Sequence, residues 1–223
     1  MKFTRCLALA ACLGAAGAAH SDDAPTWPDN FTTRLEALAL IQTLNTQILG
    51  SRSATKTLEA WCKDHALASE PKIHAHLIPG ADKAPTDEQR KRLQVGADEV
   101  VKYRHVQLTC GTHVLSEADN WYVPGRLTPE MNKQLETTDT PFGKAVESLQ
   151  PYRVTFGVKS LWSPLPDGWE NKPAAKSTTQ GHAIEVPAAI FEHDAVLYTG
   201  EHRAFSEVRE VYQRDVLAFP PPP

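Results

Sequence analysis

Six separate segments of this chain alternate apolar and polar residues with a period of two, which is typical of strands that bury one face. They are 72–78, 100–110, 114–123, 153–162, 184–191 and 205–217. The second and third are separated only by residues around Gly111 and predict a hairpin. Since runs of strands outnumber strand–helix–strand units, the sequence predicts an α+β fold: one antiparallel sheet of about six strands, with helices mainly on one face.

Helical spacing appears between the strand-like segments. Leu38, Ile41, Leu44 and Ile48 recur at intervals of three or four, and Gly50 follows them. Further helices are expected at 53–66, 128–135 and 142–149, and residues 81–96 form a charged connection. Residues 164–181 are rich in proline, glycine and polar residues, which predicts a long loop that either covers a site or simply lies at the surface.

The N-terminus has the pattern of a secretory signal peptide. Lys2 and Arg5 precede an apolar run that ends in small residues, so we expect cleavage near residue 21 and a periplasmic or secreted protein. A lipid anchor at Cys12 is a less favoured alternative. The expected organisation is a signal peptide at 1–21, a flexible lead-in at 22–33, one domain at 34–219 and a proline-rich tail at 220–223.

Composition limits the classes of partner. The net charge of −4 argues against nucleic acid, and no stretch approaches the roughly 18 apolar residues of a membrane span. Beyond the signal segment the only cysteines are Cys62 and Cys110. In an exported protein a disulfide between them is plausible, and two buried free thiols are equally compatible with the sequence.

Two ionisable residues fall on apolar strand faces. Arg104 has the same parity as Val106 and Leu108, and Glu210 the same parity as Val208 and Tyr212. Buried charges are costly unless they pair or bind a ligand, so either Arg104 and Glu210 pair with each other or they belong to a small-acid site. His74 and His76 have a spacing that metals use, but no third ligand follows, and we expect no metal or organic cofactor.

Four short stretches resemble the chorismate lyase family in order along residues 34–218. They are Ser53-Ala54-Thr55, Arg104-His105-Val106-Gln107-Leu108, Pro141-Phe142-Gly143 and the segment 207–212. The resemblance implies a chorismate-lyase-like fold in an exported member of that family.

The resemblance also implies site residues. Arg104 would hold a ring carboxylate, Glu210 would act as acid or base at the ring hydroxyl, and backbone groups at Ala54 and Phe142 would complete the pocket. Arg153 resembles a further family arginine, and a solvated strand-end charge is its alternative. The implied function is elimination of pyruvate from chorismate, or from a related carboxylated ring, to give 4-hydroxybenzoate. The alternative is an exported, non-catalytic binder of a small aromatic or carboxylated ligand.

Overall fold

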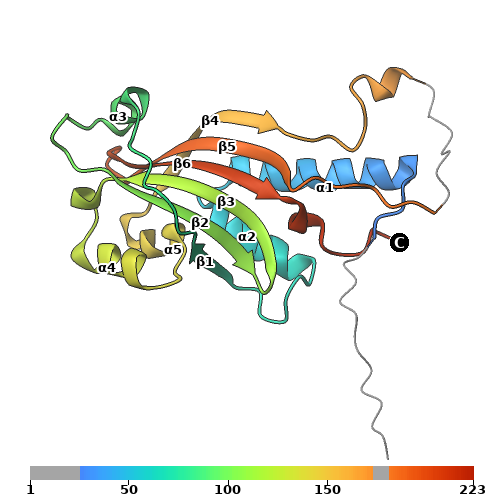
Figure 1. Ribbon diagram of the computed structural model, residues 1–223, viewed down its shortest axis with the longest axis horizontal. Helices are drawn as coiled ribbons and strands as arrows, with labels where there is room; N and C mark the ends of the chain where they lie inside the picture. Colours follow the sequence, from blue (N-terminus) through green and yellow to red (C-terminus); the bar gives the residue numbers. More distant parts are fainter. Residues whose placement is uncertain (1–25, 173–180) are drawn as a thin grey trace, which may run out of the picture.

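The structure is a computed structural model, and it describes residues 26–172 and 181–223 (Figure 1). The predicted signal peptide and Cys12 lie outside the described residues, as does the segment 173–180 of the predicted long loop. Within the described part of the chain, no helix is both long and apolar enough to cross a membrane.

One six-stranded sheet with the order β1-β2-β3-β6-β5-β4 forms the centre of the molecule. All neighbouring strands are antiparallel, which confirms the predicted fold class. The strands are β1 (Ile73–Leu77), β2 (Lys102–Cys110), β3 (His113–Tyr122), β4 (Tyr152–Ser160), β5 (Ala189–Tyr198) and β6 (Ala204–Gln213).

The helices lie mainly on one face of the sheet, called here the inner face (Figure 1). They are α1 (Phe31–Gly50), α2 (Ala54–Asp64), α4 (Pro129–Thr137) and α5 (Phe142–Ala145). The short α3 (Asp87–Leu93) lies against the opposite face, where Arg92 forms a two-pronged ion pair with Glu207 at 2.7 and 2.8 Å.

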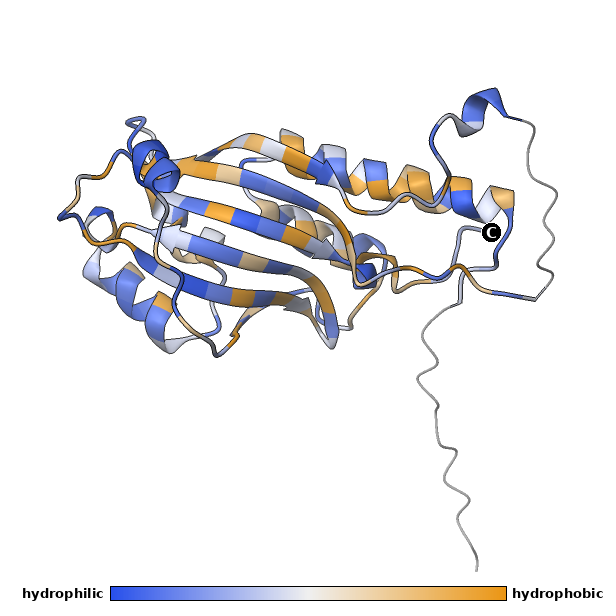
Figure 2. Ribbon diagram, turned by 45° about the horizontal axis from the view of Figure 1, so that its top comes forward, coloured by the Kyte–Doolittle hydropathy of each residue, from blue (hydrophilic) through white to orange (hydrophobic). Residues whose placement is uncertain are grey.

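The main core forms between the inner face and the first two helices. Leu44 and Ile48 of α1 and Leu58 of α2 are fully buried in one cluster with Leu108 and Val208 of the sheet. Hydrophilic and hydrophobic residues alternate along the strands (Figure 2), and polar members such as His105 and Glu117 lie on the opposite face. In an antiparallel sheet with one covered and one solvated face, apolar and polar residues alternate along each strand. The strands could therefore be predicted from the period of two in the sequence.

Two strand boundaries differ from the predicted ones. β5 begins at Ala189 rather than 184, because Pro187 has no amide to donate to a ladder and Ile184 instead bonds Trp27 outside the sheet. The charged residues Glu192 and Asp194 obscured the strand that follows. β6 ends at Gln213, and Val216 is buried from a short 3₁₀ turn (Arg214–Leu217) rather than from a strand.

The described part of the predicted long loop packs against the start of α1. Arg34 donates to the Pro164 carbonyl at 2.7 Å, and the rings of Phe31 and Trp169 lie 5.9 Å apart. A helix of 20 residues is about 30 Å long. This loop segment therefore lies far from the C-terminal end of α1, where α2 begins.

Candidate functional site

A cavity opens between the inner face and the first turns of α2 and α5. About 60 Å³ of it can hold the centre of a water molecule, and its total empty space, open solvent included, is about 620 Å³. Its wall is mainly apolar, and Val106, Leu108, Ala118, Leu197 and Val208 come from the sheet. Few polar groups interrupt this wall, an arrangement typical of small-molecule sites.

The roof of the cavity is made by two helix starts in close contact. Ser53 caps α2 by accepting a hydrogen bond from the Lys56 amide at 3.3 Å, and Ala54 and Thr55 of the first turn line the cavity. A Cβ on Gly143 would lie 3.0 Å from the Thr55 hydroxyl oxygen, so glycine allows α5 to approach this closely. First-turn amides have no partner within their own helix, so this roof presents hydrogen-bond donors.

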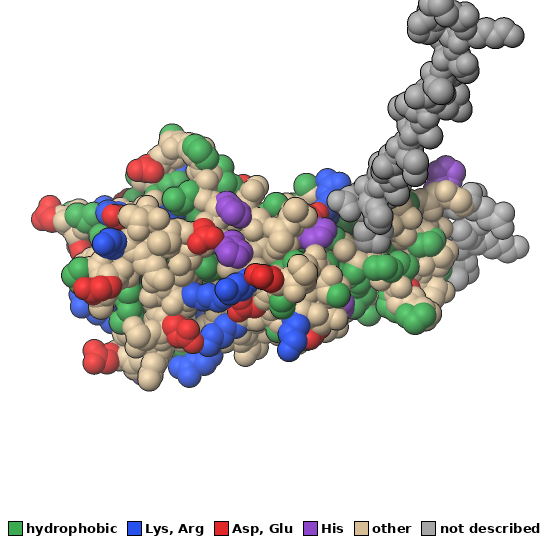
Figure 3. Space-filling view, turned by 90° about the horizontal axis from the view of Figure 1, so that it is seen from below, with side chains coloured by type: hydrophobic (Ala, Val, Ile, Leu, Met, Phe, Trp, Pro, Cys, Tyr) green, Lys and Arg blue, Asp and Glu red, His purple; other side chains and the backbone are tan. Residues whose placement is uncertain are grey.

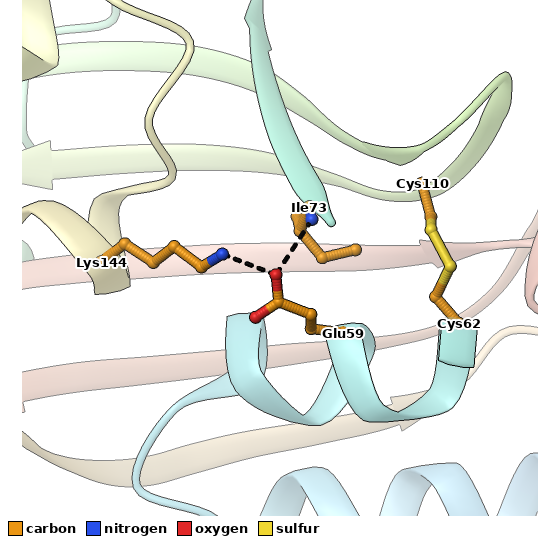
Figure 4. Close-up of a disulfide and its surroundings, with 5 residues drawn as sticks. All are labelled: Glu59, Cys62, Ile73, Cys110 and Lys144. Carbon is orange, nitrogen blue, oxygen red and sulfur yellow. Dashed lines mark hydrogen bonds and ion pairs between the residues drawn. A yellow bond between two sulfur atoms is a disulfide. The ribbon is translucent and has the colours of Figure 1, made fainter. Parts of the chain in front are cut away.

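Covalent and ionic contacts hold α2 in place (Figure 4). A disulfide joins Cys62 of α2 to Cys110 at the end of β2, which settles the question that the sequence left open. One oxygen of Glu59 accepts from Lys144 of α5 at 2.6 Å and from the Ile73 amide at 3.4 Å. The roof is therefore fixed to both the sheet and α5.

A buried ion pair lies in the cavity wall. Nη1 of Arg153, on β4, is 2.6 Å from Oε2 of Glu210, on β6, and both side chains are less than 10% exposed. Tyr212 donates to the same carboxylate oxygen at 2.9 Å. Burial alone lowers the pKa of Arg153, but the Glu210 carboxylate outweighs it and raises that pKa. Nη2 of Arg153 is buried without a hydrogen-bond partner.

Arg104 is a second buried guanidinium on the same face of the sheet. It is 6% exposed, and its Nε and Nη2 atoms are buried without a hydrogen-bond partner. It lies across from Asn120, which lines the cavity, and two residues before Val106, which also lines it. Burial lowers the pKa of Arg104, and no carboxylate within the described residues forms an ion pair with it.

Polar contacts between elements complete the surroundings of the cavity. His193 of β5, fully buried, is opposite Glu210 and bonds Asn45 of α1 at 2.7 Å. Burial, and then the charge of Arg153, lowers the His193 pKa to about 4, so this imidazole is neutral at ordinary pH. Ser206 donates to Asn120 at 2.6 Å, so the amide group of Asn120 is held at the cavity wall.

The structure brings most of the predicted site residues around one cavity. Ala54, Phe142, Arg153 and Glu210 line it, whereas Arg104 does not line it and lies beside Asn120 on the neighbouring strand. Arg153 is not a solvated strand-end charge, because its side chain is only 4% exposed. Glu210 pairs with Arg153 rather than with Arg104.

Residues near the site that the sequence interpretation missed include Asn45, Arg52, Asn120 and His193. Asn120 lies two residues after Ala118, so strand alternation could have indicated that both side chains face the same side of the sheet. Nothing in the sequence indicated that α1 would lie over β5 and bring Asn45 to His193.

The histidines singled out in the sequence lie elsewhere. His74 contacts Asp139 at 2.5 Å and His76 contacts Thr109 at 3.1 Å. His105 contacts Glu117 at 2.7 Å on the outer face. One side of the molecule mixes histidines with charges of both signs (Figure 3), and the described residues contain no group of three or more side chains arranged to hold a metal ion.

The fold and the cavity define an α+β protein with a mainly apolar cavity between its sheet and its helices. The chain belongs to the family of Uncharacterized protein y4mC of Sinorhizobium fredii, to which it is 48% identical over 197 residues, covering 88% of this chain and 83% of that protein. No family model matches the chain.

Solved structures with a similar arrangement include the ligand-binding or effector domains of transcriptional regulators. PhnF from Mycobacterium smegmatis covers 86% of this chain and 91% of its own, with 15% identity and a TM-score of 0.49. The ligand-binding domain of a putative GntR-family regulator from Bordetella bronchiseptica covers 65% of this chain and 84% of its own, with 15% identity and a TM-score of 0.41. At these values the likeness carries no functional inference.

The expected membership of the chorismate lyase family, as an exported member, is wrong. Neither the relative nor the two solved structures is named as a chorismate lyase, and no family model supports the assignment. The four matching stretches are short, and each recurs where a strand face or helix start needs such residues. They describe a shared arrangement of sheet and helices and do not establish a shared reaction.

Proposed function

We propose that this protein binds a small carboxylated, largely apolar ligand, such as an aromatic acid, without transforming it. The observation that carries the proposal is Arg104, which is 6% exposed, has two nitrogens without a hydrogen-bond partner, and is the cross-strand neighbour of Asn120 in the cavity wall. A buried cation of this kind is costly unless an anion joins it. The planar guanidinium fork matches the geometry of a carboxylate.

The charges around the cavity support an anionic ligand. Glu210 compensates Arg153 through their ion pair, so Arg104 is left as the uncompensated charge of the sheet's inner face in the described residues. The apolar wall suits the body of the ligand, because burying its surface contributes about 25 cal/mol per Å². Neither a metal nor an organic cofactor is needed for this binding.

Binding fits the geometry better than elimination does. A general acid or base must reach the proton that it transfers. One oxygen of the Glu210 carboxylate is already in an ion pair with Arg153 and accepts a hydrogen bond from Tyr212, and neutral His193 is bonded to Asn45. These contacts stabilise a fixed wall. Incubation with chorismate should therefore give no aromatic product.

Titration calorimetry of the folded protein with benzoate and 4-hydroxybenzoate tests the proposal. We expect saturable 1:1 binding, which Arg104→Met should weaken by about 30- to 150-fold, corresponding to the loss of about 2–3 kcal/mol for a charged hydrogen-bonded pair. Arg214→Gln, which removes an exposed charge beyond β6, is the matched control and should bind like the wild type. Equal affinity of the Arg104→Met variant would remove the basis of the proposal.

Export is a separate proposal that rests on the predicted signal peptide at residues 1–21. Fractionation of cells that produce the full chain tests it. Mature protein outside the cytoplasm, shortened near residue 21, is expected, and a full-length cytoplasmic protein would contradict it.

A further inference from the structure

We propose that the ligand is a dianion, and that a second anionic subsite, formed by the exposed Arg52, the buried Arg153 and the first turn of α2, binds its second acidic group. This inference rests on the proposed function and deepens it from a monoacid to a diacid. It assigns Arg52 a role in specificity.

The charge that lines the cavity is positive even before Arg104 is counted. Arg52 and Arg153 line it, and Glu210 is the carboxylate that lines it with them. Because Glu210 pairs with Arg153, the positive charge of Arg52 is not compensated. Arg104, beside Asn120 on the neighbouring strand, adds a further positive charge to the inner face. The cavity is thus suited to two negative charges rather than one.

Arg153 provides the buried donor of this subsite. Its side chain is 4% exposed, Nη1 is used by Glu210, and Nη2 is buried with no partner. Leaving a charged donor unmet in a buried position is unfavourable, so an acceptor in the cavity would stabilise it. An acidic group there would also lie beside the first-turn amides of Ala54 and Thr55, which favour anions.

Arg52 provides the exposed donor. It lies on the link between α1 and α2, it lines the cavity, and it forms no ion pair or side-chain hydrogen bond within the described residues. Its basic neighbours are already paired, Lys56 with Glu147 at 2.5 Å and Lys144 with Glu59 at 2.6 Å. At the rim, Arg52 is therefore the cation that is free to meet an incoming acid.

The two cationic regions should differ in their response to salt. Arg52 is exposed, so its attraction for an acidic group is screened at high ionic strength. Arg104 is buried, and its interaction with a carboxylate is screened much less. The affinity advantage of a diacid over a monoacid should therefore shrink as salt is added.

Titration calorimetry with benzoate and with its 3- and 4-carboxy derivatives tests the subsite on the folded, disulfide-bonded protein. We expect at least one dicarboxylate to bind ten times more tightly than benzoate at low salt. Arg52→Gln should remove most of that advantage. Arg214→Gln makes the same charge change away from the cavity and should leave the advantage intact.

The outcomes separate this inference from the proposed function. Benzoate binding that depends on Arg104, with no advantage for either dicarboxylate or an advantage unaffected by Arg52→Gln, overturns the second subsite and leaves the proposed function standing. Failure of the wild type to bind any of the three acids overturns both. An advantage that Arg52→Gln abolishes and that 0.5 M salt, a concentration with a Debye length of about 4 Å, also suppresses supports the subsite.

Discussion

Arg153 and Glu210 face each other across an intervening strand: their side chains meet at 2.6 Å although one lies on β4 and the other on β6, with β5 between them. The pair ties the edge strand to the centre of the sheet and forms one wall of the cavity. Because both side chains are buried, each charge depends on the other for its neutralisation. The effect of breaking this pair on the free energy of unfolding can be measured separately from the effect of removing Arg104.

Breaking this pair should destabilise the protein strongly. Arg153→Met leaves the Glu210 carboxylate buried without its cation, and breaking a buried pair in this way costs about 3–5 kcal/mol. Urea unfolding should show a lower midpoint at an unchanged slope. The double variant Arg153→Met/Glu210→Leu removes both charges and should recover most of the loss, and a double variant no more stable than the single one would contradict the pairing argument.

Arg104 should behave in the opposite way. Since its guanidinium has no anionic partner among the described residues, Arg104→Met removes a buried charge without exposing another. We expect the free energy of unfolding without ligand to stay within about 1 kcal/mol of the wild type or to rise. Urea unfolding in the absence of any acid measures it, with Arg153→Met as the matched comparison. A loss as large as that of Arg153→Met would mean that Arg104 is a structural partner rather than a ligand-binding cation.

The sequence predicted the sheet well because strand parity is a local property. Arg104 and Glu210 shared parity with apolar neighbours, and the structure buries both on the inner face. Which charge would meet which could not be predicted, because the order β6-β5-β4 brings Arg153 toward Glu210 and no local pattern encodes strand order. The disulfide could not be predicted for the same reason. The approach of α2 to the end of β2 depends on the tertiary structure, which no local sequence pattern encodes. β5 was misplaced because its central charged residues hid the alternation.

The disulfide should contribute substantially to stability. It joins residues 48 apart in sequence, and the chain-entropy model gives about 4 kcal/mol for a loop of that size. Reduction should lower the melting temperature by roughly 5–15 °C in a domain of this length. Calorimetry with and without a dithiol measures the change, and the Cys62→Ser/Cys110→Ser variant, already lacking the bond, should show no effect of the reductant. An unchanged melting temperature in reduced wild type, with both thiols shown to be free, would contradict this.

The burial of His193 should make the protein less stable in mild acid. Its pKa falls from 6.5 to about 4 on folding, because burial and the nearby Arg153 both disfavour the imidazolium. Between about pH 6.5 and pH 4 the unfolded chain therefore binds a proton that the folded chain does not. The stabilisation is fully present above pH 6.5, falls as pH decreases through this window, and amounts to about 3 kcal/mol for this shift.

Comparison with a variant isolates this effect from the titration of carboxylates. His193→Gln keeps an amide that can donate to Asn45 and removes the titratable ring. The difference in unfolding free energy between wild type and variant, measured by urea unfolding at several pH values from 4 to 8, should therefore shrink as the pH falls below 6.5. Because Phe191 and Tyr212 pack against the ring, the variant should be less stable at pH 8, and the dependence on pH carries the test. Parallel pH profiles for the two proteins would show that His193 does not titrate as its surroundings require.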